Sequence, residues 1–362
     1  MIRDTDEIGP GKNVKGTEMR YRDAFNKALR DELNNDKNVL IIGEDISGGF
    51  DKKTKEPLDA WGGPFAATKG LVQDFGVDRI MDAPISEAGF VGTAIGAALT
   101  GLRPVVDLMY FDFTTVAFDQ LLSNAAKSRY MFGGQTKVPL TLFARSGGGT
   151  GHAAQHSSAF YSILAHIPGL KVVTPSDPYS VKGLLSAAIR DDDPVFVVND
   201  KKLINLTGFV PDEDYQIELG KGRYLKRGKD ITLVGMSYSS VVCLDASKKL
   251  EEIGIDAKSQ VDFVQQRQPD EGEIRRGCNI SFPLGFMGGV VNKVSAMENA
   301  RYIARLYGLD PDYVESFCRW LCGLGEYFDQ PLGTYSAGMR ARFSFALMLA
   351  LDFDIYLIDE GM

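Results

Sequence analysis

Several features that define common functional classes are scarce or missing in these 362 residues. No Gly-x-x-x-x-Gly-Lys-Ser/Thr loop, which cradles nucleotide phosphates, occurs anywhere, and residues 9–13 (Gly-Pro-Gly-Lys-Asn) lack its spacing. The longest mainly apolar run, residues 343–351, is much shorter than the roughly 20 residues that span a bilayer. The polar stretch 1–17 does not resemble a signal peptide. We therefore expect a cytoplasmic protein without a transmembrane segment.

Cysteine and positive charge are also in short supply. The net charge of -8 leaves no basic stripe that could neutralise phosphates, so nucleic acid is not an expected partner. Four cysteines are few for a disulfide scaffold of this length. Cys318 and Cys322 are spaced by one helical turn, but no histidine lies near them in the sequence, so they do not predict a metal site.

Strand and helix patterns alternate through the first part of the chain. Buried strands are predicted at residues 38–43, 104–109, 139–144, 170–175 and 194–198, and helices at 19–33, 115–130 and 178–190. This order predicts an α/β fold with a mostly parallel sheet that is covered on both faces. Such sheets bind ligands at the carboxyl ends of their strands. A second, smaller unit is predicted from about residue 217, with a strand at 230–235 and a helix at 239–253.

Glu87 is the first catalytic candidate. It lies in residues 82–90 at a predicted turn between a strand and a helix, and the small residues at 92–98 predict a helix face that another backbone could approach closely. A carboxyl group held in such a place would be partly dry, and burial favours its neutral form. The alternative is a helix-start glutamate that only interacts favourably with the helix dipole.

His156 is the second candidate, because it follows the flexible glycine-rich residues 147–151. An imidazole titrates near neutral pH and can exchange protons with a substrate. The alternative is that His156 holds the loop by hydrogen bonds. His166 is interpreted as structural, and the role of His152 is left open.

Four segments in fixed order carry a family resemblance. They are residues 84–90 (Pro-Ile-Ser-Glu-Ala-Gly-Phe), 101–105 (Gly-Leu-Arg-Pro-Val), 153–157 (Ala-Ala-Gln-His-Ser) and 166–173 (His-Ile-Pro-Gly-Leu-Lys-Val-Val). Residues 19–256 thereby resemble the beta subunit of the thiamine-diphosphate-dependent 2-oxoacid dehydrogenases, the decarboxylating component of pyruvate, branched-chain and acetoin dehydrogenase complexes.

The resemblance implies a domain order. A polar tail at 1–16 precedes a transketolase-like pyrimidine-binding domain at 17–205, and a truncated transketolase C-terminal-like unit follows at 206–262. The missing strands would leave an unpaired sheet edge, so we expect weak assembly unless the remaining chain covers that edge.

The resemblance also implies roles in oxidoreductase chemistry. Glu87 would supply the carboxyl group at the pyrimidine nitrogen of thiamine diphosphate, and the cofactor would act as the electron sink for decarboxylation. Met109 and Phe113 would pack around the pyrimidine, unless they are ordinary core residues. His156 would stabilise the substrate carboxylate or assist acyl transfer to the lipoyl group of an acyltransferase.

Partners and cations follow from the same resemblance. The family anchors the diphosphate through Mg²⁺ at a Gly-Asp-Gly motif, which this sequence lacks, so a separate alpha subunit in an alpha2-beta2 heterotetramer would supply it. Residues 48–65 look more like those of acetoin-type members. Main-chain carbonyls of Leu140, Ala188, Asp191 and Asp193 match a potassium site of some members. The alternative there is a solvated helix-end turn.

Residues 263–362 resemble part of an ATP-binding-cassette (ABC) protein of capsule or O-antigen polysaccharide export. The segment 335–340 contains Ser336 and Gly338 of a signature-like motif, and 355–360 ends on Asp359 and Glu360, as a Walker B strand does. Ser295 to Glu298 forms a predicted capping box. Without a phosphate loop, ATPase activity is not expected. An exporter ATP-binding fragment and an inactive hybrid stay open as alternatives, as does the origin of the join near 256–268.

Overall fold

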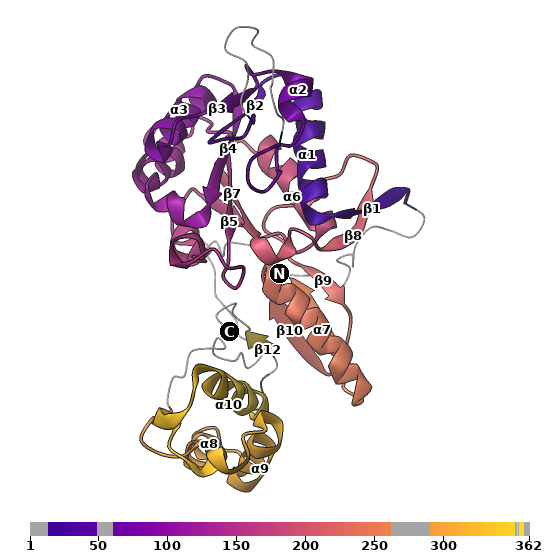
Figure 1. Ribbon diagram of the computed structural model, residues 1–362, viewed down its shortest axis with the longest axis vertical. Coiled ribbons are helices and arrows are strands. Elements are labelled where there is room, and N and C mark those ends of the chain that lie inside the picture. Colours follow the sequence, from indigo (N-terminus) through magenta and orange to yellow (C-terminus); the bar gives the residue numbers. More distant parts are fainter. Residues whose placement is uncertain (1–13, 49–60, 262–289, 352, 354, 358–362) are drawn as a thin grey trace. The chain divides into compact units, whose positions relative to one another are not determined.

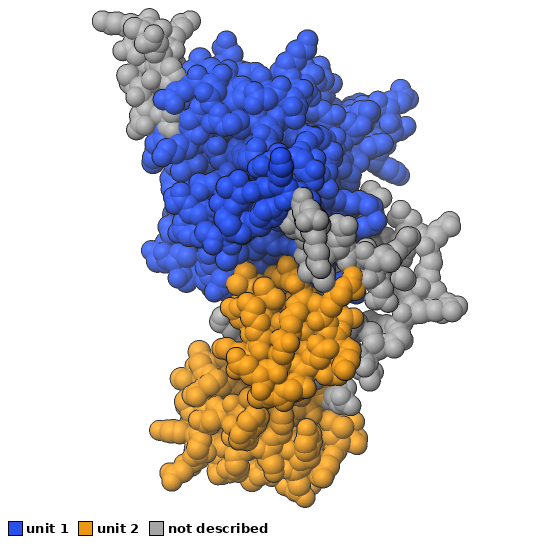
Figure 2. Space-filling model, turned by 90° about the vertical axis from the view of Figure 1, so that its right-hand side faces the viewer, with its two compact units in different colours: residues 1–224, 236–238, 261–270 blue, residues 225–235, 239–260, 271–362 orange. Residues whose placement is uncertain are grey.

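The computed structural model describes residues 14–48, 61–261, 290–351, 353 and 355–357 (Figure 1). The chain packs as two compact units (Figure 2). Unit 1 contains residues 1–224, 236–238 and 261–270, and unit 2 contains residues 225–235, 239–260 and 271–362.

Unit 1 is built on a six-stranded sheet with the order β3-β2-β4-β5-β7-β6. Its strands are β2 (Val39–Gly43), β3 (Ile80–Asp82), β4 (Arg103–Tyr110), β5 (Thr141–Ser146), β6 (Lys171–Val173) and β7 (Val195–Asp200). Every pairing is parallel. The central strands are near-continuous apolar runs because both faces are covered. The predicted α/β fold with a mostly parallel sheet is therefore confirmed.

Helices cover both faces of this sheet. They are α1 (Tyr21–Asn35), α2 (Leu71–Phe75), α3 (Glu87–Leu99), α4 (Ala126–Met131), α5 (Tyr161–Ala165) and α6 (Pro178–Arg190). Figure 1 shows α3 on one side of the sheet and α1 with α6 on the other. The helix α6 starts where Asp177 caps the backbone N–H of Ser180, with Pro178 in the first turn, which explains why its predicted bounds were correct.

One sequence expectation in unit 1 needs correction. The single helix predicted over 115–130 is divided into a 3-10 turn (Phe111–Thr115), a π-helical turn (Gln120–Ala125) and α4. The small-residue face of α3 is open in the described chain, so the close approach of another backbone stays a prediction. A Cβ added at Gly92 would meet only the Gln120 side chain, at 3.8 Å, and nothing lies within 4 Å at Gly96, because that part of the helix is not fully buried.

Unit 1 also contains a two-stranded antiparallel sheet, β1 (Gly16–Arg20) with β8 (Thr207–Pro211), which the sequence patterns did not predict.

Unit 2 contains a four-stranded sheet with the order β12-β10-β11-β9. Its strands are β9 (Arg223–Lys226), β10 (Ile231–Gly235), β11 (Ala257–Val261) and β12 (Ile355–Leu357), and α7 (Tyr238–Glu252) follows β10. The strand β12 pairs in parallel with β10. Residues 355–357 therefore cover one edge of this sheet, where the sequence analysis expected an unpaired edge.

The remaining helices of unit 2 have their own apolar core. They are α8 (Ala296–Leu306), α9 (Pro311–Cys322) and α10 (Ala337–Ala350). The predicted capping box at Ser295 and Glu298 is present, and Gly308 follows α8 with a φ of 69°. Cys318 lies in this core, where burial raises the pKa of its thiol to about 12. No helix in the described ranges is both long and apolar enough to cross a bilayer.

Candidate active site

The carboxyl ends of the six parallel strands of unit 1 lie at one edge of the sheet, where α/β folds bind ligands. Polar residues follow several of these strands. The loop after β2 is tied to the end of β3, because the backbone N–H of Ser47 donates to the Asp82 carboxylate at 2.9 Å. This edge therefore brings together residues that are far apart in the sequence.

Glu87 is the first residue of α3, and the residue is only 8% exposed. Its carboxyl group has no hydrogen-bond or ion-pair partner among the residues that the structure describes. Glu44 follows β2 directly. Burial raises the pKa of Glu44, and the negative charges of Asp45 and Glu87 raise it further. The charges of Glu44 and Glu87 thus interact at the ends of neighbouring strands.

An aromatic group lies after β4. The ring of Tyr110 contacts that of His156 edge-on at 4.3 Å between centroids, and Phe113 lies 5.4 Å from the same imidazole. The rings of His152 and Phe65 also lie near Tyr110, at 5.8 and 5.3 Å between centroids. The Thr150 hydroxyl is 2.8 Å from Nδ1 of His152. These contacts fix the orientation of the His156 ring on an apolar support.

Lys201, which follows β7, contacts the segment that carries His156. Its ammonium donates to the His156 carbonyl oxygen and lies 5.5 Å from the Tyr110 ring centroid. Burial lowers the pKa of Lys201, and the carboxylates of Asp112 and Asp200 oppose that shift. Lys201 is 5% exposed, so a buried cation supports the loop that carries the imidazole.

A buried ion pair lies beneath the aromatic group. Asp107 on β4 accepts a hydrogen bond from the Arg145 guanidinium on β5, and both residues are almost fully buried. The same carboxylate accepts the backbone N–H of Met109 at 2.8 Å. Met109 has a φ of 60°, which is uncommon for a residue other than glycine.

The sequence-predicted residues fall into two groups at this edge. The structure brings Phe113 and His156 into contact, and Met109 lies at the end of β4, shortly before Phe113 in the chain. Glu87 lies after β3, beside Glu44. No hydrogen bond, ion pair or ring contact joins the two groups within the described part of the chain.

Sequence reasoning missed several residues of the site. Glu44 and Lys201 were available as polar residues at strand ends, which is a usable signal. Arg145 and Tyr110 also directly follow predicted strands, but their part in the site depends on β4 and β5 being neighbours.

The residues predicted for a potassium site lie at the other end of the sheet. The Leu140 carbonyl accepts the backbone N–H of Val195 at 2.9 Å, and that of Ala188 accepts the N–H of Asp191 at 3.3 Å. The Asp191 carbonyl accepts from the Arg103 guanidinium at 3.0 Å. The Asp193 carboxylate faces Arg129 and Lys171. These carbonyls already have partners in the chain, and the potassium site stays a prediction.

The residues predicted for the ABC-like segment lie in unit 2. Ser336 caps α10 by accepting the N–H of Met339 at 3.3 Å, and Gly338 has open space beside it. Asp359 and Glu360 lie outside the described residues, as does most of the loop 48–65. In the ranges that can be described, no group of three or more His, Cys, Asp or Glu side chains is arranged to hold a metal ion.

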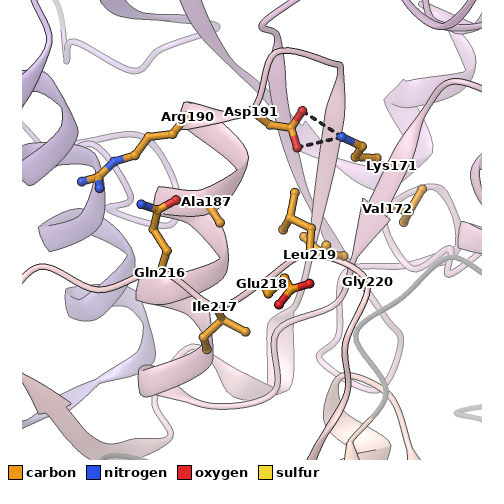
Figure 3. Close-up of a pocket in the computed structure, with 11 residues that line it drawn as sticks. Lys171, Val172, Ala187, Arg190, Asp191, Gln216, Ile217, Glu218, Leu219 and Gly220 are labelled. Atoms are coloured by element: carbon orange, nitrogen blue, oxygen red, sulfur yellow. Dashed lines mark hydrogen bonds and ion pairs between the residues drawn. The ribbon is translucent and has the colours of Figure 1, made fainter. Parts of the chain in front are cut away.

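A cavity of about 550 Å³ opens beside β6, the last turn of α6 and residues 216–220 (Figure 3). Its charged side chains are paired within the chain. Lys171 contacts the Asp191 carboxylate at 2.8 Å, and Arg190 contacts Glu32 at 2.7 Å. It lies away from the residues of the candidate active site, so it adds no group to that site.

Comparisons with known proteins agree with this geometry. The transketolase pyrimidine-binding domain matches residues 17–207. The chain is 48% identical over 236 residues to the beta subunit of the acetoin:2,6-dichlorophenolindophenol oxidoreductase of Bacillus subtilis, covering 65% of this chain and 69% of that protein. It is 40% identical over 240 residues to the beta subunit of the 2-oxoisovalerate dehydrogenase of the same organism, with coverage of 66% and 70%.

Solved structures share the fold. A split-gene transketolase, described as an inactive beta4 tetramer, aligns with a TM-score of 0.52 at 23% identity, over 67% of this chain and 71% of that one. Transketolase from Leishmania mexicana aligns with a TM-score of 0.54 at 15% identity, over 70% and 36%.

Proposed function

Because this chain belongs to the transketolase pyrimidine-binding family, and within it to the beta subunits of acetoin and 2-oxoacid dehydrogenases, we propose that it is the beta subunit of such a thiamine-diphosphate-dependent oxidoreductase. The observation that carries this proposal is Glu87, a residue only 8% exposed, at the carboxyl edge of a parallel sheet. Its charge interacts with that of Glu44, and no hydrogen bond or ion pair engages its carboxyl group in the described chain.

The residues present fit the pyrimidine half of thiamine diphosphate. A carboxyl group without a hydrogen-bond partner in the described chain suits a heteroaromatic nitrogen, with which it can share a proton. Met109, at the end of β4, and Phe113, in the 3-10 turn that follows, are partly buried and could flank a flat ring. The edge thus offers both a hydrogen-bonding group and apolar packing, which is what a pyrimidine requires.

When bound, the cofactor supplies the electron sink for decarboxylation or for cleavage beside a carbonyl group. The chain's own residues would do the rest. Glu87 would hold a proton at the pyrimidine nitrogen, and proton transfer of this kind typically contributes about 10²–10⁴-fold. His156, held against Tyr110 and supported by Lys201, would act on the substrate carboxylate or on acyl transfer.

The rest of the enzyme would come from partner chains. This sequence has no Gly-Asp-Gly motif, so an alpha subunit would bind Mg²⁺ and the diphosphate in an alpha2-beta2 heterotetramer. A lipoyl-bearing acyltransferase would accept the product acyl group. A potassium ion at the carbonyls of Leu140 and Ala188, and a cytoplasmic location, belong to the same proposal.

For residues 263–362 we propose a partial ABC ATPase segment that follows a truncated transketolase-like unit at 206–262. Its support is the signature-like sequence at Ser336 and Gly338, together with a helical core separate from that of unit 1. An exporter's ATP-binding fragment remains the second candidate function. The missing phosphate loop argues against ATP hydrolysis.

The test is acceptor reduction by the full chain co-purified with an alpha subunit. Acetoin, pyruvate and 2-oxoisovalerate would each be offered with 2,6-dichlorophenolindophenol, with and without thiamine diphosphate and Mg²⁺. The proposal predicts reduction that needs the cofactor, and the preferred substrate identifies the enzyme type. Absence of reduction with all three substrates, from an assembly that binds the cofactor, would contradict it.

A further inference from the structure

The end of β4 departs from regular strand geometry next to the candidate active site. The pairing of β4 with β5 shifts register between Asp107 and Tyr110, as in a β-bulge. Within this bulge Met109 has a φ of 60°, a left-handed conformation that is unfavourable for a side chain of this size. Such a conformation persists only when the surroundings impose it.

The Asp107 carboxylate supplies that constraint. Its Oδ1 accepts the backbone N–H of Met109 at 2.8 Å, two residues along the chain, which is the local turn that aspartate side chains stabilise. Asp107 is 6% exposed, and a lone carboxylate buried so deeply would be costly.

Arg145 compensates for this burial. It is paired with Tyr110 in the register of the two strands, and its guanidinium donates to the same Oδ1 of Asp107. The guanidinium carbon lies 4.8 Å from the ring centroids of both Phe65 and Phe143, at the distance of a cation–π contact. The guanidinium thus balances the negative charge of the carboxylate, and the two side chains are shielded from water.

We propose that the buried Asp107–Arg145 pair is a positioning device that holds Met109 in its left-handed conformation. The end of β4 then presents Met109 and Tyr110 to the carboxyl edge. The inference rests on the proposed function in one respect, because it assigns this presentation to the binding of the cofactor's pyrimidine. Both residues act through Met109, so neither is a catalytic residue.

The experiment uses the full chain co-purified with an alpha subunit and compares Asp107→Ala with Asp107→Asn. Asparagine keeps an oxygen that can accept the Met109 N–H, whereas alanine does not. Glu32→Ala is the matched control, because Glu32 is also a buried carboxylate paired with an arginine, Arg190, at a distance from the site. Hydrogen exchange at the Met109 amide is measured without cofactor, and thiamine diphosphate affinity by calorimetry.

We expect Asp107→Ala to speed exchange of the Met109 amide and to raise the Kd for thiamine diphosphate by about tenfold, the effect of losing one hydrogen bond. In Asp107→Asn, the exchange rate of the Met109 amide and the Kd for thiamine diphosphate should stay close to those of the wild type. Glu32→Ala should lower the melting temperature and leave both readouts unchanged. Unchanged exchange in Asp107→Ala, or equal effects of Glu32→Ala, would overturn the inference.

A second variant tests the inference if Asp107→Ala folds poorly. Glycine adopts positive φ without strain, so Met109→Gly added to Asp107→Ala should raise its melting temperature, whereas a lower one would contradict the inference. If the wild-type assembly binds no thiamine diphosphate, the proposed function fails, and hydrogen exchange alone decides the inference. Protection that is lost in Asp107→Ala and kept in Asp107→Asn then supports it, and unchanged protection overturns it.

Discussion

Glu44 and Glu87 show how the fold tunes individual residues. Their carboxyl groups interact at the ends of neighbouring segments, and the pKa of Glu44 is raised by burial, by Asp45 and by Glu87. Because the neutral form of Glu44 is favoured in the folded state, its contribution to stability is complete below its ordinary pKa of 4.5 and is lost as the pH rises through the raised value.

Glu44→Gln removes this titration and makes a testable prediction. The free energy of unfolding of the variant, relative to that of the wild type, should increase as the pH rises from about 4 to about 8, because only the wild type develops the unfavourable charge. Urea unfolding at both pH values measures it. A difference that does not change with pH would contradict the proximity of Glu44 to Glu87.

The two histidines His156 and His166 form a natural pair for mutagenesis. His156 is held in the aromatic group by Tyr110 and Lys201, whereas His166 is exposed at the end of α5. We predict that His156→Asn lowers kcat by about 10²-fold or more, as loss of a proton-transferring group does. His166→Asn should stay close to the wild-type rate in the same acceptor assay. Equal losses would indicate a structural role for both.

At the residue scale, the sequence predicted those site residues that have a local sequence signal. Glu87 stands at a strand-to-helix turn and His156 in a glycine-rich loop, and the structure places both at the carboxyl edge. Arg145 and Lys201 could not be predicted in this way. Their partners, Asp107 and His156, lie 38 and 45 residues away in the sequence, so their roles appear only once the strand order is known.

At the scale of single elements, capping residues determine where several helices begin. The α8 capping box joins Ser295 and Glu298, with the Glu298 N–H donating to the Ser295 hydroxyl at 3.1 Å. We predict that Ser295→Ala lowers the free energy of unfolding by about 1 kcal/mol, whereas Ser295→Asn, which can also cap, costs less. Urea unfolding of both variants checks this, and equal losses would show that the cap contributes little.

Elements with strong local signals were predicted well, and those that depend on packing were not. The bounds of α6 agree with the sequence because a proline and a capping aspartate fix its start. The region 115–130 reads as one helix from its apolar spacing. Its π-helical turn at Gln120–Ala125 has no sequence signature and arises where the segment packs into the core around Leu121.

At the scale of the whole molecule, two large apolar clusters of the described chain share no residue. One lies in unit 1 and joins the sheet to α3, α4 and α5, and the other lies in unit 2 and joins α8, α9 and α10. All candidate catalytic residues belong to unit 1. The family could be predicted from sequence motifs, whereas the placement of β12 beside β10 could not, because it joins residues more than a hundred positions apart.

The sequence also predicts whether the chain hydrolyses ATP. Because no phosphate-binding loop occurs in the sequence, the purified protein should not turn over ATP, even though unit 2 carries the signature-like segment at Ser336. Phosphate release with Mg²⁺ and ATP measures this, with Ser336→Ala as a matched variant. ATP turnover that disappears in Ser336→Ala would instead support the hypothesis of an exporter's ATP-binding fragment.

The most direct measurement is substrate-dependent acceptor reduction by the assembled enzyme, comparing the wild type, Glu87→Gln and Glu32→Gln. Glutamine at 87 keeps the size of the side chain but cannot exchange the proton, so the rate should fall by about 10²–10⁴-fold. Glu32→Gln alters another buried glutamate, away from the site, and should keep a rate near that of the wild type. A Glu87→Gln enzyme as active as the wild type would contradict the account.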